Sequence, residues 1–215
     1  MKDYVAFFSG GKDGFYAVYL AQKRGMNVRY LLTLKTTIGL SPHYENIKSI
    51  EKISHNMKRK MVTFDMSLGN QKLSEFIKNL GVSGIIGGDI NLEDHLRWID
   101  NIARNANIEA IEPLWKMDSS SLVKEMIENG FVYSIIAVDK KCLPKKYLGY
   151  TFKDTDDLER FVSENPSVDP AGEGGEFHTV VLDSPLFERA MALKVNKMLE
   201  SDKYLYLDFD LEVIE

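Results

Sequence analysis

The chain has 215 residues, of which 44% are hydrophobic, and its formal net charge is −5. A chain of this length can bury a sizeable core, and the acidic balance argues against a surface that attracts nucleic acid globally. The single cysteine, Cys142, excludes an internal disulfide and a cysteine-based metal cage.

Strand-like and helix-like segments alternate through the first half of the chain. The expected strands are 4–8, 28–34, 61–65, 84–90 and 108–115, and the expected helices begin at residues 15, 44, 71 and 92. After the first strand, Phe15, Val18 and Tyr19 recur at the spacing of a core-facing helix. This alternation predicts an α/β fold with a parallel sheet and crossover helices.

The first strand runs into Ser9-Gly10-Gly11-Lys12-Asp13-Gly14 at the expected start of a helix. Glycines let the backbone approach an anion closely, and the first N–H groups and the dipole of a helix attract it. The spacing matches neither the P-loop pattern nor the dinucleotide fingerprint. We predict a phosphate-binding loop of another class, in which Lys12 supplies the charge; a glycine-rich turn with an exposed lysine is the alternative.

Two further loops follow strands at the edge where ligands of open parallel sheets bind. The polar loop 35–46 contains His43, which either reaches a nucleotide or substrate or is a surface histidine. After the fourth expected strand come Gly87-Gly88-Asp89. Asp89 could orient an incoming group, hold the magnesium that accompanies ATP, or only cap the next helix. His95 on that helix is a weaker candidate, because single polar residues on an amphipathic helix usually face solvent.

The alternation pauses at polar turn and capping residues around 115–121, and we place a domain boundary there, between domains 1–117 and 118–215. Beyond it we expect strands over 131–138, 177–182 and 204–214. The expected helices are 122–129, and 156–164 with Asp156 and Glu159 as a capping pair. The second domain is therefore a smaller α+β region.

Residues 172–179, Gly-Glu-Gly-Gly-Glu-Phe-His-Thr, combine two carboxylates, an imidazole and three glycines. A hairpin turn would explain the glycines but not the charge beside an apolar strand. In an extended segment Glu176 and His178 project to the same side, so they could share a pocket as base, acid or magnesium contacts. We predict functional use of this segment, including Glu173.

Taken together, these motifs resemble the archaeal branch of the diphthine-ammonia ligase family. The matching segments are 9–13, 88–90, Pro113-Leu114-Trp115, and 172–179 followed by Asp183 and Pro185-Leu186-Phe187. The first segment alone resembles the pyrophosphate loop of N-type ATP pyrophosphatases, which use ATP to adenylate a substrate. The resemblance implies a Rossmann-like domain of the HUP type that binds ATP, a small family-specific domain, and a substrate held between them.

The reaction implied by the resemblance is amide formation. The carboxylate of diphthine, a modified histidine of elongation factor 2, would attack the α-phosphate of ATP to give an acyl adenylate and pyrophosphate. Ammonia would then displace AMP to leave diphthamide. Lys12, loop amides and magnesium held by Asp13 or Asp89 would compensate the negative charges. Glu173 and Glu176 would position the acceptor or deprotonate ammonium, and His178 could assist.

The motifs and the resemblance together give two sets of expected site residues, one for nucleotide binding and one for catalysis. His43 and Asn46 stand where the family has a similar histidine and asparagine. The expected nucleotide-binding residues are Ser9, Gly10, Gly11, Lys12, Asp13, Gly14, His43, Asn46 and Gly88. The expected catalytic residues are Lys12, Asp89, Glu173, Glu176 and His178, with Asp13 and Asp89 as magnesium ligands.

The chain departs from the family pattern at four positions. Gly14 stands where relatives usually have serine, and Asp94, Trp98 and Ala103 stand where tyrosine, arginine and cysteine are common. Loss of the arginine bears on acceptor recognition. Two alternatives therefore stay open: a paralogous AMP-forming ligase with another acceptor, and a non-catalytic ATP-binding protein.

The expected partners are elongation factor 2 and ammonium, and edge-strand pairing would allow a homodimer. A tRNA-thiolating or lysidine-forming relative would usually have a basic RNA-binding surface, and thiolating types often have paired cysteines, so the acidic balance and the lone Cys142 count against both and against a direct nucleic-acid partner. No apolar stretch approaches the roughly 20 residues of a membrane span, and Met1-Lys2-Asp3 leads into the first strand without a signal-peptide core. We therefore expect a cytoplasmic protein with no membrane partner.

Overall fold

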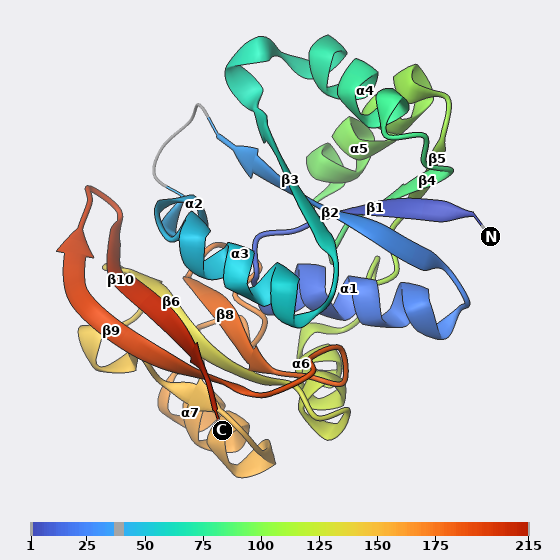
Figure 1. The fold of residues 1–215 in the computed structure, drawn as a ribbon. Coiled ribbons are helices and arrows are strands. Elements are labelled where there is room, and N and C mark those ends of the chain that lie inside the picture. Colours follow the sequence, from blue (N-terminus) through green and yellow to red (C-terminus); the bar gives the residue numbers. More distant parts are fainter. Residues whose placement is uncertain (1, 37–40, 215) are drawn as a thin grey trace.

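A parallel sheet organises the first half of the chain (Figure 1) in the computed structural model, which describes residues 2–36 and 41–214. The strand order is β3-β2-β1-β4-β5, and each adjacent pair is parallel. The bounds in chain order are β1 Asp3–Phe7, β2 Asn27–Lys35, β3 Lys60–Asp65, β4 Gly84–Ile86 and β5 Glu109–Ile111. The chain crosses over in opposite directions on the two sides of β1, which creates the crevice where such sheets bind ligands.

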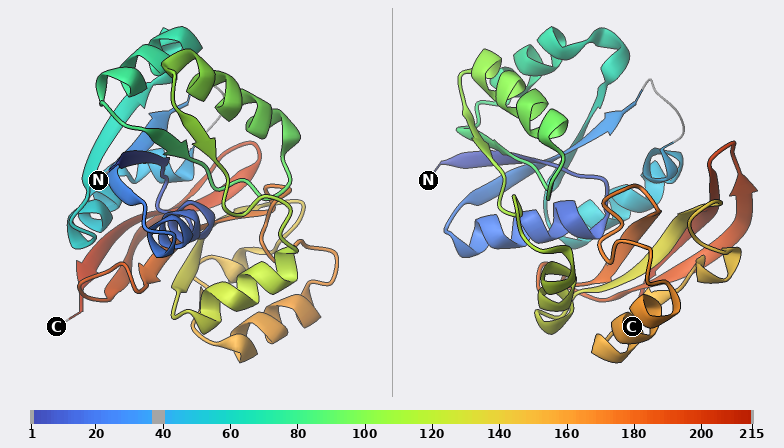
Figure 2. Two further views of the ribbon diagram at one scale, coloured as in Figure 1. Left: turned by 90° about the vertical axis from the view of Figure 1, so that its right-hand side faces the viewer. Right: turned by 180° about the vertical axis from the view of Figure 1, so that it is seen from behind.

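Helices cover both faces of this sheet (Figures 1 and 2). On one face lie α1 (Lys12–Lys23) and α3 (Ile47–Asn56), and on the other lie α4 (Asn70–Asn79) and α5 (Glu93–Ala106). Side chains alternate along the strands, so Ala6 packs in the core with α1 while Val5 packs with α4 and α5. A short helix α2 (Pro42–Glu45) precedes α3; residues 37–40 of the loop predicted over 35–46 lie outside the described residues.

An antiparallel sheet dominates the second half. Its path is β7-β6-β10-β9, and β8 pairs with β6. The bounds are β6 Val132–Asp139, β7 Thr151–Phe152, β8 Phe177–Asp183, β9 Met191–Glu200 and β10 Tyr204–Val213. The helices of this half are α6 (Ser119–Glu128) and α7 (Thr155–Glu164), with a short 3₁₀ turn at Lys145–Tyr147; another 3₁₀ turn, Met66–Leu68, follows β3 in the first half. The predicted α/β fold with a smaller α+β region is confirmed.

The two sheets share one hydrophobic core, with α1 and α3 lying between them (Figure 1). The backbone N–H of Val181 on β8 donates to the carbonyl of Gly10 at 3.0 Å. The hydroxyl of Ser49 on α3 donates to the carbonyl of Phe209 on β10 at 2.9 Å. The first contact brings the edge of β8 directly against the loop that opens α1, and the second joins α3 to β10.

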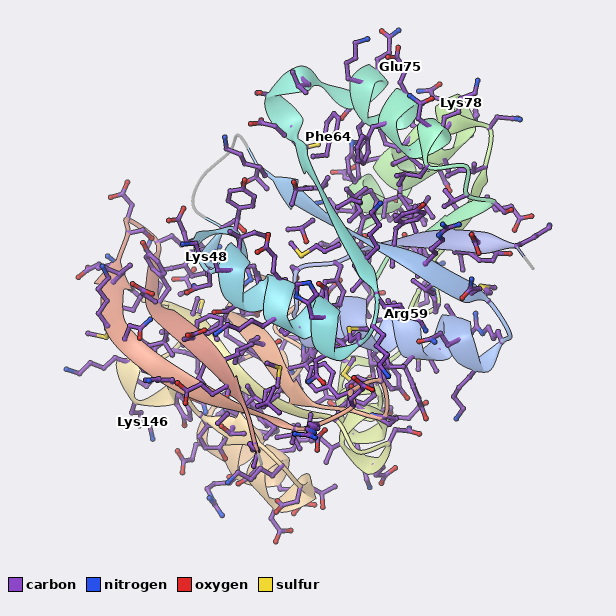
Figure 3. The ribbon with its side chains drawn as sticks, viewed as in Figure 1. Lys48, Arg59, Phe64, Glu75, Lys78 and Lys146 are labelled. Atoms are coloured by element: carbon purple, nitrogen blue, oxygen red, sulfur yellow. The ribbon has the colours of Figure 1, made fainter. Side chains whose placement is uncertain are left out.

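Apolar side chains around α4 face the sheet, and charged side chains face outward. Phe64 lies beneath α4 against Phe76, with ring centroids 5.4 Å apart, whereas Glu75 and Lys78 point away from the sheet (Figure 3). Within residues 2–36 and 41–214, none of the helices has both the length and the apolar character required to cross a membrane.

Several element boundaries differ from the prediction. Strand β4 ends at Ile86 rather than at residue 90, and the loop 87–89 that follows packs on the first turn of α1; β5 ends at Ile111 rather than at 115. Strand β9 was not predicted. Helix α7 is capped by Asp154, whose carboxylate accepts from the Asp157 N–H at 3.0 Å, and not by Asp156.

Candidate functional site

A cavity of about 380 Å³ opens at the carboxyl ends of β1, β2 and β4. Six segments line it: the loop after β1, the end of β2, the start of α2, residues 87–89 after β4, one face of α5, and residues 171–179 of the second half. The strand order explains this convergence, because β1 lies beside both β2 and β4 and its loop faces the crevice. Most of the residues predicted as functional therefore meet in one place.

Glycines allow the backbone of these segments to approach closely. Gly10 has a φ of +85°, a conformation that other residues rarely adopt. A Cβ built on Gly88 would lie 2.9 Å from the Gly14 nitrogen and 3.0 Å from the Asp13 carbonyl carbon. The loop after β4 thus packs backbone to backbone on the first turn of α1, with the first N–H groups of the helix at the cavity.

Lys12 lies in the wall of the cavity and is only 2% exposed. Its ammonium donates to both carboxylate oxygens of Asp13 at 2.9 Å and to the carbonyl of Ala171. Its backbone N–H donates to the Thr179 hydroxyl at 3.2 Å. Both halves of the chain therefore hold this lysine, and an incoming phosphate would compete with Asp13 for its charge.

Two histidines face each other in the cavity. The rings of His43 and His178 are perpendicular with centroids 5.5 Å apart, and His178 packs on Tyr204 at 5.0 Å. Burial lowers the pKa of His43 and lowers that of His178 to about 3, so both rings are neutral at neutral pH. His43 Nε2 lies 2.9 Å from the Thr179 carbonyl, so Nε2 carries the proton and Nδ1 is an acceptor.

Asp89 and His95 form a pair at the rim of the cavity, with Oδ1 and Nδ1 3.1 Å apart. The hydrogen bond to Asp89 raises the pKa of His95. Asp89 does not cap α5, because the N-cap position is Leu92. His95, the weaker candidate in the sequence, therefore belongs to the site.

Glu112 is a residue that the sequence reasoning missed. Its Oε2 accepts from the backbone N–H of Asp89 at 3.3 Å, and its Oε1 is buried with no partner among the described residues. Burial, reinforced by the Asp89 charge, raises the pKa of Glu112 to about 8. Glu112 was missed because it lay inside the strand predicted over 108–115. The signal that could have identified it was an acid at the carboxyl end of a strand, just before Pro113.

Glu173 connects the second half of the chain to the loop after β4. Its Oε1 accepts from the N–H groups of Ile90 and Asn91, both at 3.1 Å, and burial raises its pKa. Glu176 does not line the cavity, whereas His178 does. The Oε2 atom of Glu176 is buried without a partner in the described part of the chain, and the Glu176 carboxylate packs against Gly174.

Asn46 lies outside the lining of the cavity. Its amide nitrogen donates to the carbonyls of Pro42 at 2.8 Å and Leu207 at 2.9 Å, and its oxygen accepts from the Phe209 N–H at 2.9 Å. These bonds join α2 to β10 and occupy the side-chain amide with backbone partners.

Of the four positions that depart from the family pattern, Gly14 and Trp98 line the cavity. A Cβ on Gly14 would lie 3.2 Å from the Phe7 carbonyl, so this backbone leaves little room for a side chain. Asp94 is exposed and pairs with Arg97, and Ala103 is buried between α5 and the sheet.

Two carboxylates at the cavity could contact a metal ion. Over residues 2–36 and 41–214, no three His, Cys, Asp or Glu side chains converge as a metal cage. The side chains of Asp13 and Asp89 line the cavity and are 31% and 17% exposed. Magnesium at nucleotide sites typically takes one or two carboxylates together with phosphate oxygens, so this donor set fits a nucleotide-bound magnesium.

Comparisons with known proteins assign both halves of the chain to one family. Models of the diphthamide synthase N-terminal and C-terminal domains match residues 1–110 and 118–214. A diphthine-ammonia ligase from Danio rerio is 30% identical over 135 residues, 61% of this chain and 52% of that protein. The Homo sapiens diphthine-ammonia ligase is 32% identical over 120 residues, 55% of this chain and 45% of that protein. The chain thus spans about half the length of these relatives.

A solved structure with a partly similar outline is a predicted subunit of a tRNA methyltransferase from Methanocaldococcus jannaschii. It is 16% identical with a TM-score of 0.46, over 86% of this chain and 98% of that one.

Proposed function

The chain belongs to the diphthamide synthase family, and on that premise we propose that it is an ATP-dependent ligase that amidates diphthine on elongation factor 2. The observation that carries the proposal is the convergence at the cavity. Residues 171–179, from the segment matched by the C-terminal family model, close on the glycine loop of the N-terminal segment. A nucleotide at the loop would therefore contact both halves.

In this proposal residues 9–14 bind the phosphates of ATP. The N–H groups at the start of α1 and the helix dipole supply positive potential, and Lys12 supplies a full charge. Phosphate oxygens would take over part of the hydrogen bonding that Lys12 now gives to Asp13. His43, held by the Thr179 carbonyl, keeps one wall of this subsite in place.

The first step joins the diphthine carboxylate to the α-phosphorus of ATP. A carboxylate oxygen forms the new P–O bond, and the bond to the pyrophosphate oxygen breaks. Lys12 stabilises the charge that develops on the leaving pyrophosphate. Magnesium, when bound by Asp13 or Asp89 together with phosphate oxygens, supplies further charge compensation.

The second step forms the amide. Ammonia attacks the acyl carbon and AMP leaves, so ammonium must first lose a proton. The neutral ring of His178 lines the cavity and can accept a proton; the negative charge of a bound phosphate would raise its pKa. The carboxylate of Asp89 also lines the cavity and can accept a proton as well.

Glu173 and Glu176 act beside these groups. Glu173 holds the loop after β4 through the N–H groups of Ile90 and Asn91, and so positions Asp89. Glu176 has one buried oxygen without a partner in the described part of the chain, which leaves a hydrogen-bond acceptor for a donor on the acceptor substrate.

The test is release of AMP and pyrophosphate from ATP, magnesium and ammonium, with and without diphthine-bearing elongation factor 2. Lys12→Ala and Glu176→Ala should abolish factor-dependent release. Their matched controls are Lys72→Ala and Glu75→Ala, which remove a solvent-exposed ion pair on α4 and should leave release unchanged.

Three results would contradict the proposal in different ways. Turnover with another carboxylate but not with the factor would indicate a paralogous AMP-forming ligase. ATP binding without turnover on any acceptor would indicate a non-catalytic ATP-binding protein. Factor-dependent turnover that survives in Lys12→Ala would remove the glycine loop from the mechanism.

A further inference from the structure

One wall of the cavity is an aromatic ring that is held rigidly before any ligand binds. Trp98 on α5 lines the cavity and stacks on Phe7 at the end of β1, with ring centroids 5.3 Å apart and planes inclined by 28°. Its indole N–H donates to the side-chain oxygen of Asn70 at the start of α4, at 3.0 Å. Two contacts from different elements therefore fix both the position and the tilt of the ring.

The cavity wall is chemically divided. Leu32, Leu34, Trp98 and Ile99 come from the cluster packed between the sheet and the α4–α5 layer, and they present apolar surface. Lys12, Asp13, His43 and His178 come from α1, α2 and β8, and they present polar groups. Each side has an exception, since Phe177 also lines the polar side and His95 the apolar side. A ligand that places phosphate at Lys12 and extends across the strand ends toward α5 meets the apolar surface.

We propose that Trp98 is the base-stacking residue of this cavity, against which the purine of bound ATP lies while its phosphates occupy the glycine loop. The inference rests on the proposed function because it takes ATP as the ligand. A purine presents a flat π face, and stacking on an aromatic side chain needs a fixed ring of matching tilt, which the Phe7 and Asn70 contacts supply.

A ligand at this wall meets the face of the ring, because the only donor of Trp98, its indole N–H, already donates to Asn70. The ring therefore offers an apolar stacking surface, which suits a base.

Binding of two ligands separates the role of the ring from that of the loop. Calorimetry would compare ATP with inorganic triphosphate, each with magnesium, for the wild type, Trp98→Leu and Trp98→Phe. We expect Trp98→Leu to raise the Kd for ATP about tenfold or more, because stacking of one base is worth that much, and to leave the Kd for triphosphate within about twofold. Trp98→Phe keeps an aromatic face and should retain most of the affinity for ATP.

A spectroscopic measurement gives an independent readout. The chain has two tryptophans, so Trp115→Phe leaves Trp98 as the single indole. In that variant, saturating ATP should change the fluorescence intensity, and saturating triphosphate should leave it nearly unchanged.

Each contrary result overturns the inference. An unchanged Kd for ATP in Trp98→Leu would show that the base does not contact the ring. Equal weakening of ATP and triphosphate would show that the substitution collapses the pocket. A raised KM for the acceptor with an unchanged Kd for ATP would assign the ring to the acceptor. A wild type that binds neither ATP nor triphosphate would instead refute the proposed function, and the inference with it.

Discussion

Replacing Gly88 with alanine would test how the site is built from backbone. A Cβ at residue 88 would lie 2.9 Å from the Gly14 nitrogen, 3.0 Å from its Cα and 3.0 Å from the Asp13 carbonyl carbon. All three atoms belong to the main chain of the first turn of α1, so no side-chain rotation relieves the contact. Either the helix start or the loop 87–89 must move by a few tenths of an ångström.

The expected cost follows from this contact. Overpacking a tight site typically destabilises a protein by about 1–3 kcal/mol, so we expect the free energy of unfolding of Gly88→Ala to fall by about 2 kcal/mol. The same displacement moves the N–H groups that face the phosphates. We expect the Kd for ATP to rise about tenfold or more, which corresponds to roughly 1.4 kcal/mol of binding free energy.

Gly25→Ala provides a control with a loss of stability similar to that of Gly88→Ala. Gly25 has a φ of +81° and no atom within 4 Å of a built Cβ, so alanine there meets backbone strain without crowding. It follows α1 at the end opposite the cavity, and its cost should be about 1–2 kcal/mol. Urea unfolding and calorimetry with ATP would compare the two variants. Wild-type ATP affinity in Gly88→Ala, or equal loss of affinity in both variants, would show that the packing of Gly88 on α1 does not shape the ATP site.

Three further predictions concern single side chains. Asn46→Ala should lower the free energy of unfolding by about 2–3 kcal/mol, because three buried hydrogen bonds are lost, and leave the Kd for ATP within about twofold; a large loss of ATP affinity at unchanged stability would instead place Asn46 at the nucleotide. Burial raises the folded-state pKa of Glu112 to about 8 from an ordinary 4.5, so between these values the unfolded chain binds fewer protons and stability falls as pH rises. In urea unfolding, the free energy of unfolding of Glu112→Gln should fall less steeply with rising pH than that of the wild type. The same pH dependence in both proteins would argue against a protonated Glu112. Burial lowers the folded-state pKa of His178 to about 3 from 6.5, so the free energy of unfolding decreases as pH falls below about 6.5. His178→Gln should reduce that decrease. The same decrease of the free energy of unfolding with falling pH in both proteins would contradict this.

The alternation of segments was enough to predict the parallel sheet, because apolar runs and helical spacing are local properties of the chain. The residues at which the strands end were harder to predict from the sequence. Residues 87–90 are compatible with extended structure, and only the packing of Gly88 on Gly14 shows that β4 has ended. Strand β9 was missed because most of its side chains are exposed, so it lacks the alternation that marks a half-buried strand.

The positions of the site loops were predictable, but their mutual contacts were not. Rules for open parallel sheets predicted that residues 9–14, 43 and 87–89 lie near a ligand site. The bonds from Lys12 to Ala171 and from Glu173 to Ile90 join residues 159 and 83 positions apart, and no local pattern encodes them. The expected shared pocket of Glu176 and His178 assumed an extended segment, whereas Gly175 has a φ of +77° and β8 begins only at Phe177.

The fate of isotopically labelled ammonium would show whether this protein forms an amide on elongation factor 2. The protein would be incubated with ATP, magnesium, labelled ammonium and diphthine-bearing elongation factor 2, and the modified histidine of the factor would be analysed by mass spectrometry. We predict that the label enters that side chain as an amide, with one AMP formed for each labelled nitrogen incorporated. We also predict that Lys12→Ala incorporates no label. Consumption of ATP to AMP without label in the factor would contradict it.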